Sequence, residues 1–478
     1  MNTFITEKDG AVRTVPLAHA LAERIVNTPS HSLPALAMDR AKMSLASTIA
    51  SAAMGYRIDS ARIIRELAID DGGAAMATVW FDAARLPLAN TARVNALASD
   101  AAASDDSDLR SIAHIGTVIS TVALAVGERE RASGHEVLAA MVLGYELAGR
   151  IDEVLTPGRM QRGFHGSVST VFGACVAAGR LLKLDTEGMT QAIALSATSI
   201  GGMAIAADTS WAREYHAGLA ASTGVQAALA ARRGFQGEAG VLEHPRGFFH
   251  ALGGQSIEDL THGWGEDWDI VTDMAIKLMP GAHPFHATAE AAADAARAGK
   301  VDAEDIARVV ITAAVQWTNF KGDPHPRNLV DAAHSLVYFV AAAIVDDGFG
   351  WEHMDTDKMA DPVIARLQDK VEFDPNPPPL PDRFPHRHGG MVTIHMKDGT
   401  EYRSTCRAPR GSGPRGVQWH DVEEKFRQLF PKAGLPANAT EECLAIIRGL
   451  DQAEGLTELT RCLTPQSQHQ QDKMKETP

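Results

Sequence analysis

The stretch Ala217-Gly-Leu-Ala-Ala-Ser-Thr-Gly-Val-Gln-Ala-Ala228 is made almost entirely of small residues with helical spacing. Small side chains let helix backbones approach one another closely, which suits a densely packed all-α core. Alanine- and leucine-rich patterns of the same period recur from about Pro16 to Gly254, and glycine, proline or Asp/Ser/Asn clusters interrupt them. We therefore predict a helical bundle in this half of the chain, with helices at 33–53, 134–151, 168–182, 185–200 and 217–233.

The pattern changes near Trp264, where short runs rich in branched residues begin to alternate with helical ones. The runs 391–396 and 401–405 indicate a hairpin, because Asp398-Gly399 between them is a favourable turn. Interleaved strands and helices of this kind predict a compact α+β domain. Its expected strands also include 274–279 and 307–315, and its expected helices are 284–298 and 329–346.

Helical spacing resumes at 419–429 and 441–450, and these helices are expected to rejoin the bundle. The predicted fold is mainly α, with a large all-α helical domain and a smaller inserted α+β lid domain. The final residues carry too little apolar surface to fold and are expected to be disordered. The expected boundaries are 1–265 for the first part of the helical domain, 266–408 for the lid domain, 409–463 for the returning helices and 464–478 for the tail.

The composition argues against several classes of partner and cofactor. The 478 residues include 60 acidic and 45 basic side chains, a formal net charge of −15, which disfavours nucleic acid and anionic membrane surfaces as partners. The four cysteines lack the short spacings of an iron–sulfur cluster or a structural zinc site, and their scatter is typical of a reducing compartment. The N-terminus is polar and no apolar run is long enough to span a membrane, so a cytoplasmic protein is expected.

Two histidines stand in unusual surroundings, each with an arginine within three residues. His165 lies in Gln161-Arg-Gly-Phe-His-Gly-Ser167, and His216 lies in Trp211-Ala-Arg-Glu-Tyr-His-Ala-Gly218. Imidazole titrates near neutral pH and a guanidinium binds carboxylates through a fixed fork, so this combination suits proton transfer beside a carboxylate. Each histidine could instead be structural, His165 as a cap of its own turn and His216 as a packing residue of the bundle.

Several motifs follow one another in a characteristic order. They are Gly163-Phe-His-Gly-Ser167, Glu214-Tyr-His-Ala-Gly-Leu-Ala-Ala221, Ala231-Arg-Arg-Gly-Phe-Gln-Gly237, Pro245-Arg-Gly-Phe248, Asp331-Ala-Ala-His-Ser335 and Trp419-His-Asp-Val-Glu-Glu-Lys-Phe426. In these motifs, and from about Ala20 to Leu450, the chain resembles the MmgE/PrpD family, which includes 2-methylcitrate dehydratases, cis-aconitate decarboxylases and iminodisuccinate epimerase. The resemblance implies a homodimer of two-domain subunits, an active site in the cleft where the smaller domain covers the helical one, and catalysis without metal or organic cofactor.

The resemblance also implies that His165 is the family's active-site histidine. Arg213 takes the place of a lysine three residues before His216, and on a helix the two side chains share one face, so Arg213 is expected to hold a substrate carboxylate. We assign substrate binding to Arg213 in preference to His216, which we keep as a second candidate. Arg162 is also expected to bind a carboxylate, and His334 is expected on a helix that faces the cleft.

Asp105, Asp106 and His114 stand at the place of the family's acidic motif followed by a histidine. The resemblance implies that His114 is catalytic and that the two aspartates contact the substrate. The motif departs from the usual Asp-x-Asp-Asp-Thr, because Ala103 replaces the first aspartate and Ser107 replaces the threonine. The acids could instead form only a helix N-cap, since Ser/Asp runs often begin helices.

The segment Lys277-Leu-Met-Pro-Gly-Ala-His-Pro-Phe-His286 contains two further histidines at the turn from strand to helix. The proline between them spoils a helical metal chelate, and no carboxylate ligand is near in sequence. The resemblance implies that one of them, His283 or His286, faces the cleft. We choose His283 as catalytic and expect Lys277 to support the anionic substrate.

Histidine acid/base catalysis beside carboxylate-binding cations predicts a lyase, and the resemblance implies that it needs neither a metal nor a cofactor. The expected substrate is a small di- or tricarboxylate, as in 2-methylcitrate dehydratase or cis-aconitate decarboxylase, and the expected intermediate is a carbanion next to a carboxylate. Because dehydration, decarboxylation and epimerisation share that carbanion, an epimerase or isomerase of a substituted succinate is an alternative. A non-catalytic dimer that binds a metabolite is an alternative of another class.

Overall fold

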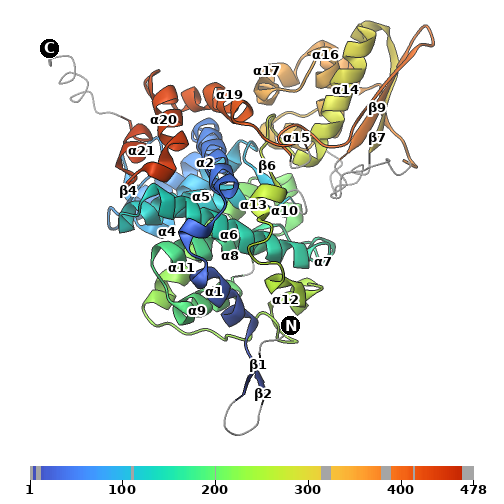
Figure 1. Ribbon diagram of the computed structural model, residues 1–478. Helices are drawn as coiled ribbons and strands as arrows, with labels where there is room; N and C mark the ends of the chain where they lie inside the picture. The colour runs from blue at the N-terminus through green and yellow to red at the C-terminus, as the bar shows by residue number, and fades with distance from the viewer. Residues whose placement is uncertain are drawn as a thin grey trace, which may run out of the picture.

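The computed structural model describes residues 4–6, 12–108, 112–199, 201–313, 324–377, 389–412 and 415–465. Most of the molecule is a body of packed helices, and a smaller domain projects from one end of it (Figure 1). The helices of the body that precede the small domain are α1 (Leu17–Asn27), α2 (Ala35–Gly55), α3 (Asp59–Asp71), α4 (Leu88–Ala101), α5 (Ile115–Glu130), α6 (Gly134–Leu155), α7 (Gly158–Gln161), α8 (Ser167–Leu181), α9 (Thr186–Ser196), α10 (Ala204–Thr209), α11 (Ala212–Arg232), α12 (Phe248–Leu252) and α13 (Asp269–Thr272). Two short antiparallel ladders accompany them, β1 (Phe4–Thr6) with β2 (Val12–Thr14) and β3 (Ala77–Thr78) with β4 (Arg85–Leu86).

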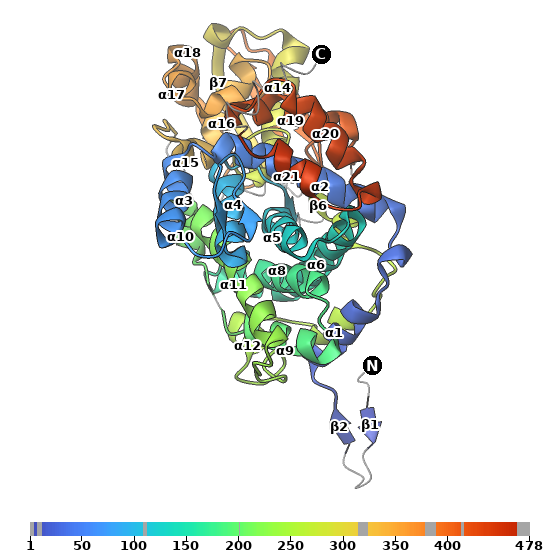
Figure 2. The ribbon, with the colours of Figure 1, turned by 90° about the vertical axis from the view of Figure 1, so that its left-hand side faces the viewer.

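The centre of the body is formed by helices that cross at glycines, chiefly α5, α6, α8 and α11 (Figure 2). A Cβ on Gly144 of α6 would lie 2.7 Å from the carbonyl oxygen of Gly173 in α8. A Cβ on Gly224 of α11 would lie 2.4 Å from the Cβ of Ala174 in α8. Such distances admit no side chain, so the small residues set how closely these helices pack.

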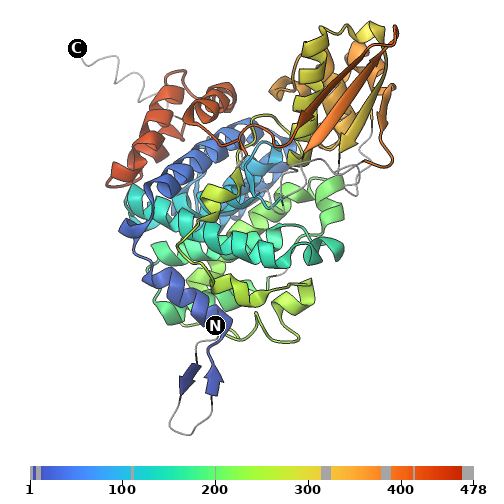
Figure 3. The same cartoon turned by 45° about the vertical axis from the view of Figure 1, so that its right-hand side comes forward.

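The small domain is a four-stranded sheet with helices against it (Figure 3). The strand order is β10-β9-β7-β8, in which β9 is antiparallel to β10 and β7, whereas β8 is parallel to β7. Val309 and Ile311 of β7, Ile394 of β9 and Phe339 belong to its separate apolar core. The elements are α14 (His286–Gly299), β7 (Ile306–Ala313), α15 (Leu329–Ala333), α16 (Leu336–Val345), α17 (Thr356–Met359), α18 (Pro362–Gln368), β8 (Val371–Phe373), β9 (Gly390–Met396) and β10 (Glu401–Cys406).

Two expectations for the small domain are wrong. The run 274–279 is not a strand of its sheet, because only β6 (Met274–Ala275) is extended and it pairs with β5 (Ser107–Asp108) of the helical body. The helix expected over 329–346 is two helices, α15 and α16. The Ser335 hydroxyl accepts a hydrogen bond from the amide of Tyr338 and begins the second helix.

After the small domain the chain returns to the body through α19 (Trp419–Leu429), α20 (Ala439–Arg448) and α21 (Thr457–Cys462), whose apolar residues join the core of the first helices. The predicted fold class, mainly α with a smaller inserted α+β domain, is confirmed. The residue boundaries of the domains stay predictions, and tail residues 466–478 lie outside the described residues. None of the described helices is long and apolar enough to cross a lipid bilayer.

Candidate active site

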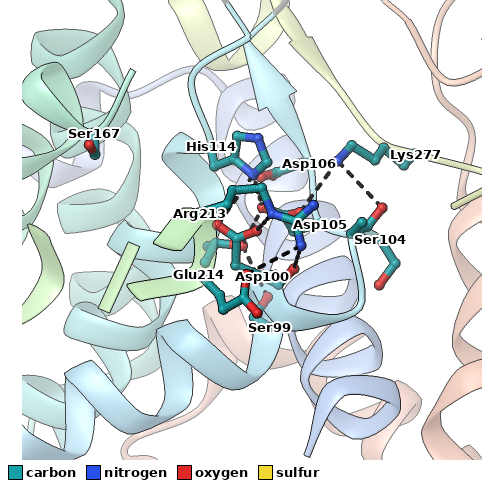
Figure 4. A network of polar contacts seen from close by, with 12 residues as sticks. Ser99, Asp100, Ser104, Asp105, Asp106, His114, Ser167, Arg213, Glu214 and Lys277 are labelled. Carbon is teal, nitrogen blue, oxygen red and sulfur yellow. Dashed lines mark hydrogen bonds and ion pairs between the residues drawn. The ribbon is translucent and has the colours of Figure 1, made fainter. Parts of the chain in front are cut away.

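The acidic segment after α4 meets the beginning of the small domain through the β5–β6 ladder. The ladder is antiparallel, with Ser107 opposite Ala275. Nearby, the amide of Gly281 donates to the carbonyl oxygen of Ala103 at 2.8 Å. These backbone contacts bring charged side chains from α4, α5, α11 and the Lys277 segment into one buried cluster (Figure 4).

His114 directly precedes α5 and lies against Asp105. Its Nδ1 is 2.6 Å from Asp105 Oδ2, and the Thr117 hydroxyl donates to the same oxygen at 3.0 Å. Although burial opposes it, the charges of His114 and Lys277 hold the pKa of Asp105 well below its usual range. We assign the proton to Nδ1 of His114, since an ionised carboxylate can only accept. Within the described residues, the bonds of Asp105 run to side chains and not to the amides of α5, so it does more than cap a helix.

Arg213, at the start of α11, is buried against Asp100, at the end of α4. Its Nε donates to Asp100 Oδ1 at 2.7 Å and its Nη2 donates to the Asp100 carbonyl at 2.8 Å. Burial alone would lower the pKa of Arg213, but the carboxylates of Asp100 and Glu214 raise it, so the guanidinium stays charged. Nη1 has no hydrogen-bond partner among the described residues.

Lys277 is buried on the other side of Asp105. Its Nζ is 3.5 Å from Asp105 Oδ1 and 3.5 Å from the carbonyl oxygen of Ala103. Burial lowers the pKa of Lys277, and the Asp105 carboxylate opposes that effect. The predicted residues His114, Asp105, Arg213 and Lys277 are therefore brought together by four separate segments of the chain.

The same cluster has one feature of a metal site. Asp100, Asp105 and His114 each offer a ligand atom, and these atoms lie within 4.8 Å of one another. The carboxylate oxygens already face the positive charges of Arg213 and Lys277, which repel a further cation. The arrangement fits ion pairing better than metal binding, and metal-independence stays a prediction.

His165, between α7 and α8, continues a row of three imidazoles. Its ring centroid is 6.0 Å from that of His114 and 5.5 Å from that of His216. Its amide donates to the Gly202 carbonyl at 2.9 Å, and its Nδ1 lies 3.4 Å from the hydroxyl oxygen of Ser167. Burial, and next the charges of His114 and His216, hold the pKa of His165 well below its usual range. The neutral form of His165 is therefore favoured.

Asp106 and Lys425 form a second buried layer next to Asp105. Burial raises the pKa of Asp106 to about 6, although Ser44 donates a hydrogen bond to it at 2.5 Å. Burial also lowers the pKa of Lys425 to about 7, against the pull of Asp105 and Asp106. A Cβ on Gly116 would lie 2.0 Å from Asp106 Oδ2, so this glycine lets the carboxyl group lie directly against α5. Among the described residues the hydrogen bond of the Asp106 carboxyl goes to Ser44, not to the groups around His114.

Three predicted residues have other surroundings. His283 and His286 are buried beside each other, with ring centroids 4.6 Å apart, and His286 also stacks on Phe339. Arg162 is exposed, and its Nη1 donates to two carbonyl oxygens of α12. These contacts do not join the three residues to the cluster, and the catalytic role of His283 and the binding role of Arg162 stay predictions.

Models of two protein domains match the chain. The MmgE/PrpD N-terminal domain matches residues 19–259, and the MmgE/PrpD C-terminal domain matches residues 279–451. The chain belongs to the MmgE/PrpD family. The two matches cover the helical body and then the small domain with the returning helices.

Curated MmgE/PrpD relatives are similar along most of their length. Cis-aconitate decarboxylase from Homo sapiens is 26% identical over 439 residues, which cover 89% of this chain and 90% of that protein. The enzyme of the same name from Mus musculus is 28% identical over 360 residues, 72% of each chain. Cis-aconitate decarboxylase from Aspergillus terreus is 23% identical over 470 residues, 91% of this chain and 94% of that protein.

Sequence reasoning about this MmgE/PrpD chain missed Asp100, Glu214 and Lys425 as members of the cluster. A signal existed for Lys425, because it shares the buried face of α19 with Val422 and Phe426, where an apolar residue is the rule. Asp100 is an acid on the buried face of an alanine-rich helix, which is also unusual. Glu214 had no such signal, since it directly follows Arg213 in sequence.

His334 was expected to face the cleft and lies at the end of α15. Burial, and next the charges of Arg213 and Lys277, lower the pKa of His334 to about 4. Its Nδ1 is 2.8 Å from the carbonyl oxygen of Val330. His334 is therefore an uncharged imidazole that the small domain contributes near the cations of the site.

Proposed function

We propose that this protein is a cofactor-independent lyase that acts on a small di- or tricarboxylate, and that cis-aconitate is the first substrate to test. The observation that carries the proposal is the buried His114–Asp105 pair with Arg213 and Lys277 beside it. The proposal is supported by the chain's membership of the MmgE/PrpD family and by its similarity to cis-aconitate decarboxylases over most of their length.

In the proposed complex, the substrate carboxylates bind to Arg213 and Lys277. The free Nη1 of Arg213 offers a charge-assisted hydrogen bond, while Nε stays fixed on Asp100. Lys277, 3.5 Å from Asp105, adds a second positive charge. Positive charge in a buried site also offsets the negative charge that builds up on a carbanion next to a carboxylate.

Decarboxylation of cis-aconitate in this site needs one proton donor. The bond between the carbon skeleton and one carboxylate breaks, carbon dioxide leaves, and the electron pair spreads over the double bond and a remaining carboxylate. His114, protonated on both ring nitrogens for this step, then gives the proton of its Nε2 to the carbanion, while its Nδ1–H stays hydrogen-bonded to Asp105. A positioned acid of this kind contributes about 10²–10⁴-fold to a rate.

In dehydration and epimerisation at the same site, a proton is first removed from the substrate. Uncharged His165 takes a proton from the carbon next to a carboxylate, and His114, 6.0 Å away by ring centroid, protonates the leaving hydroxyl or the opposite face of the carbanion. The alternatives of a 2-methylcitrate dehydratase-like lyase and of an epimerase of substituted succinates rest on this pair of histidines.

The test is a substrate screen of the purified protein in deuterated water. Cis-aconitate, trans-aconitate, citrate, 2-methylcitrate and substituted succinates are incubated separately, and products are identified by NMR and carbon dioxide release. We expect carbon dioxide release from cis-aconitate with one deuterium bound to carbon in the product. Metal analysis of the active preparation checks that the reaction needs no metal ion.

The other outcomes separate the alternatives. Loss of water from citrate or 2-methylcitrate indicates a dehydratase. Incorporation of deuterium into carbon without release of water or carbon dioxide indicates an epimerase. Ligand binding without exchange or product supports the non-catalytic dimer and rejects a lyase. We also propose a homodimer, which light scattering of the purified protein tests.

A further inference from the structure

Lys425 is a lysine on the apolar face of α19, the first helix that returns from the small domain. It is 2% exposed, and the other buried residues of this helix are Val422, Phe426 and Leu429. Its ammonium donates to the hydroxyl oxygen of Ser47 at 2.8 Å. A charged group therefore occupies a position where helix packing calls for an apolar side chain.

Burial of an ammonium is unfavourable unless opposite charges and hydrogen bonds compensate it. The charged groups that act on Lys425 are Asp105 and Asp106, which attract it, and Lys277, which repels it. Asp106 Oδ1 is buried and has no hydrogen-bond partner in the described part of the chain. The ring of Trp351, from the small domain, lies 5.6 Å from the ammonium and adds a cation–π contact.

The second hydrogen bond of Lys425 runs to the carbonyl oxygen of Ser104. This carbonyl belongs to the peptide group that ends at the nitrogen of Asp105. Rotation of that peptide would displace Asp105, whose Oδ2 now lies 2.6 Å from Nδ1 of His114. The ammonium thus fixes the backbone immediately before the carboxylate that orients the imidazole.

We propose that Lys425 is a positioning residue of the active site, which holds the Ser104–Asp105 peptide so that Asp105 meets His114. It does not touch the substrate in this proposal. The kinetic part of the test rests on the proposed function, whereas the spectroscopic part does not. The inference adds the returning helix α19 to the segments of the chain that assemble the site.

The kinetic test compares K425M with K432M, which makes the same change at an exposed lysine of the same region. We expect K425M to lower kcat about 10–100-fold with little change in KM, because a small misplacement of the catalytic pair slows the chemistry and not binding. The acidic limb of the pH profile should move to higher pH, since Asp105 and Asp106 lose a positive neighbour. K432M should match the wild type. An unchanged kcat and pH profile in folded K425M would overturn the proposal.

The second test needs no substrate. A proton held between His114 Nδ1 and a carboxylate at 2.6 Å should give a far-downfield ¹H resonance, assigned by its loss in D105N. We expect this resonance to broaden or move upfield in K425M and to stay in place in K432M. If the wild type is inactive on every substrate but the resonance responds, the proposed function fails and the positioning role stands. A resonance that does not respond in K425M rejects the positioning role.

A milder variant guards against misfolding of K425M. S47A removes one acceptor of the ammonium and leaves the charge in place. If K425M does not fold, we expect S47A to lower kcat about three- to tenfold and to shift the same resonance in the same direction. An S47A variant with wild-type kcat and resonance would then overturn the proposal.

Discussion

His114 and His165 lie 6.0 Å apart by ring centroid, yet their surroundings are opposite in kind. His114 is buried, and its Nδ1 faces a carboxylate at 2.6 Å. The imidazole of His165 accepts a hydrogen bond from the Ser167 amide at 3.3 Å and lies 3.4 Å from the Ser167 hydroxyl oxygen, and its charged neighbours are cations. One imidazole is bound to an anion and the other is kept uncharged.

Under the proposed function, this difference would let two identical side chains divide one proton transfer. A carboxylate partner fixes the tautomer of an imidazole and stabilises its positive form, as a proton donor requires. Burial near other cations favours the neutral form, as a proton acceptor requires. Pairs of titratable groups in contrasting environments are a general sign of acid/base assignments.

The largest effects are expected when each of the two histidines is removed in turn, which tests whether their roles differ. We expect H165A and H114A each to lower turnover about 10²–10⁴-fold. H165A should leave the melting temperature nearly unchanged, whereas H114A should lower it, because Asp105 loses a partner in a buried site. Steady-state kinetics and thermal unfolding measure both effects, with the exposed His420 changed to alanine as control. Normal turnover in H165A would exclude His165 from the chemistry.

Substitutions of Arg213 test the buried ion pair that it forms with Asp100. R213M leaves Asp100 buried without its guanidinium partner, and removal of one member of a buried ion pair typically costs about 3–5 kcal/mol of unfolding free energy. R213K keeps a positive charge at this position, so its loss of stability should be smaller. Chemical denaturation measures the stability and KM reports the binding. If R213M were as stable as R213K, the ion pair with Asp100 would not support the fold.

The pH dependence of the free energy of unfolding tests the raised pKa of Asp106. Its pKa is raised from an ordinary value of 3.8 to about 6, so the folded chain binds this proton more tightly than the unfolded chain does. The wild type should therefore lose stability relative to D106N as the pH rises from about 4 to about 6, by on the order of 3 kcal/mol. Denaturant unfolding at several pH values measures this difference, and a difference that is constant with pH would show that Asp106 ionises normally.

The smallest effect is expected at Arg162. Its guanidinium holds carbonyl oxygens of α12 and is exposed, so a contribution to carboxylate binding is screened by water. We expect R162A to raise KM about two- to fivefold at unchanged kcat, the pattern of lost ground-state binding. An unchanged KM would restrict Arg162 to anchoring α12.

Much of the helical body was predictable because the pattern that marks each of its helices is local in sequence. Small residues at helical spacing, as in 217–228, bring helices together wherever they occur, and α11 contains that stretch. The hairpin of β9 and β10 was predictable from its Asp398-Gly399 turn. In contrast, the break between α15 and α16 depends on a serine hydroxyl that caps the second helix, and helical periodicity continues across it.

The candidate site could be predicted only through the order of motifs in which the chain resembles the MmgE/PrpD family. His114, Asp105 and Arg213 came from that order, and the structure brings them together. Asp100 and Lys425 were missed because their partners lie far away in sequence, as the 113 positions between Asp100 and Arg213 illustrate. Burial of a charge is decided by the whole fold, so composition within one helix indicates it only weakly.

The β5–β6 ladder has a mechanical consequence for the protein as a whole. It pairs the acidic segment that follows α4 with Met274 and Ala275, and Met274 packs in the core of the helical body just before the chain enters the small domain. A displacement of the residues that lead into the small domain would therefore act on the strand that follows Asp105. The register of this ladder thus links the position of Lys277, two residues after β6, to that of the acids it faces.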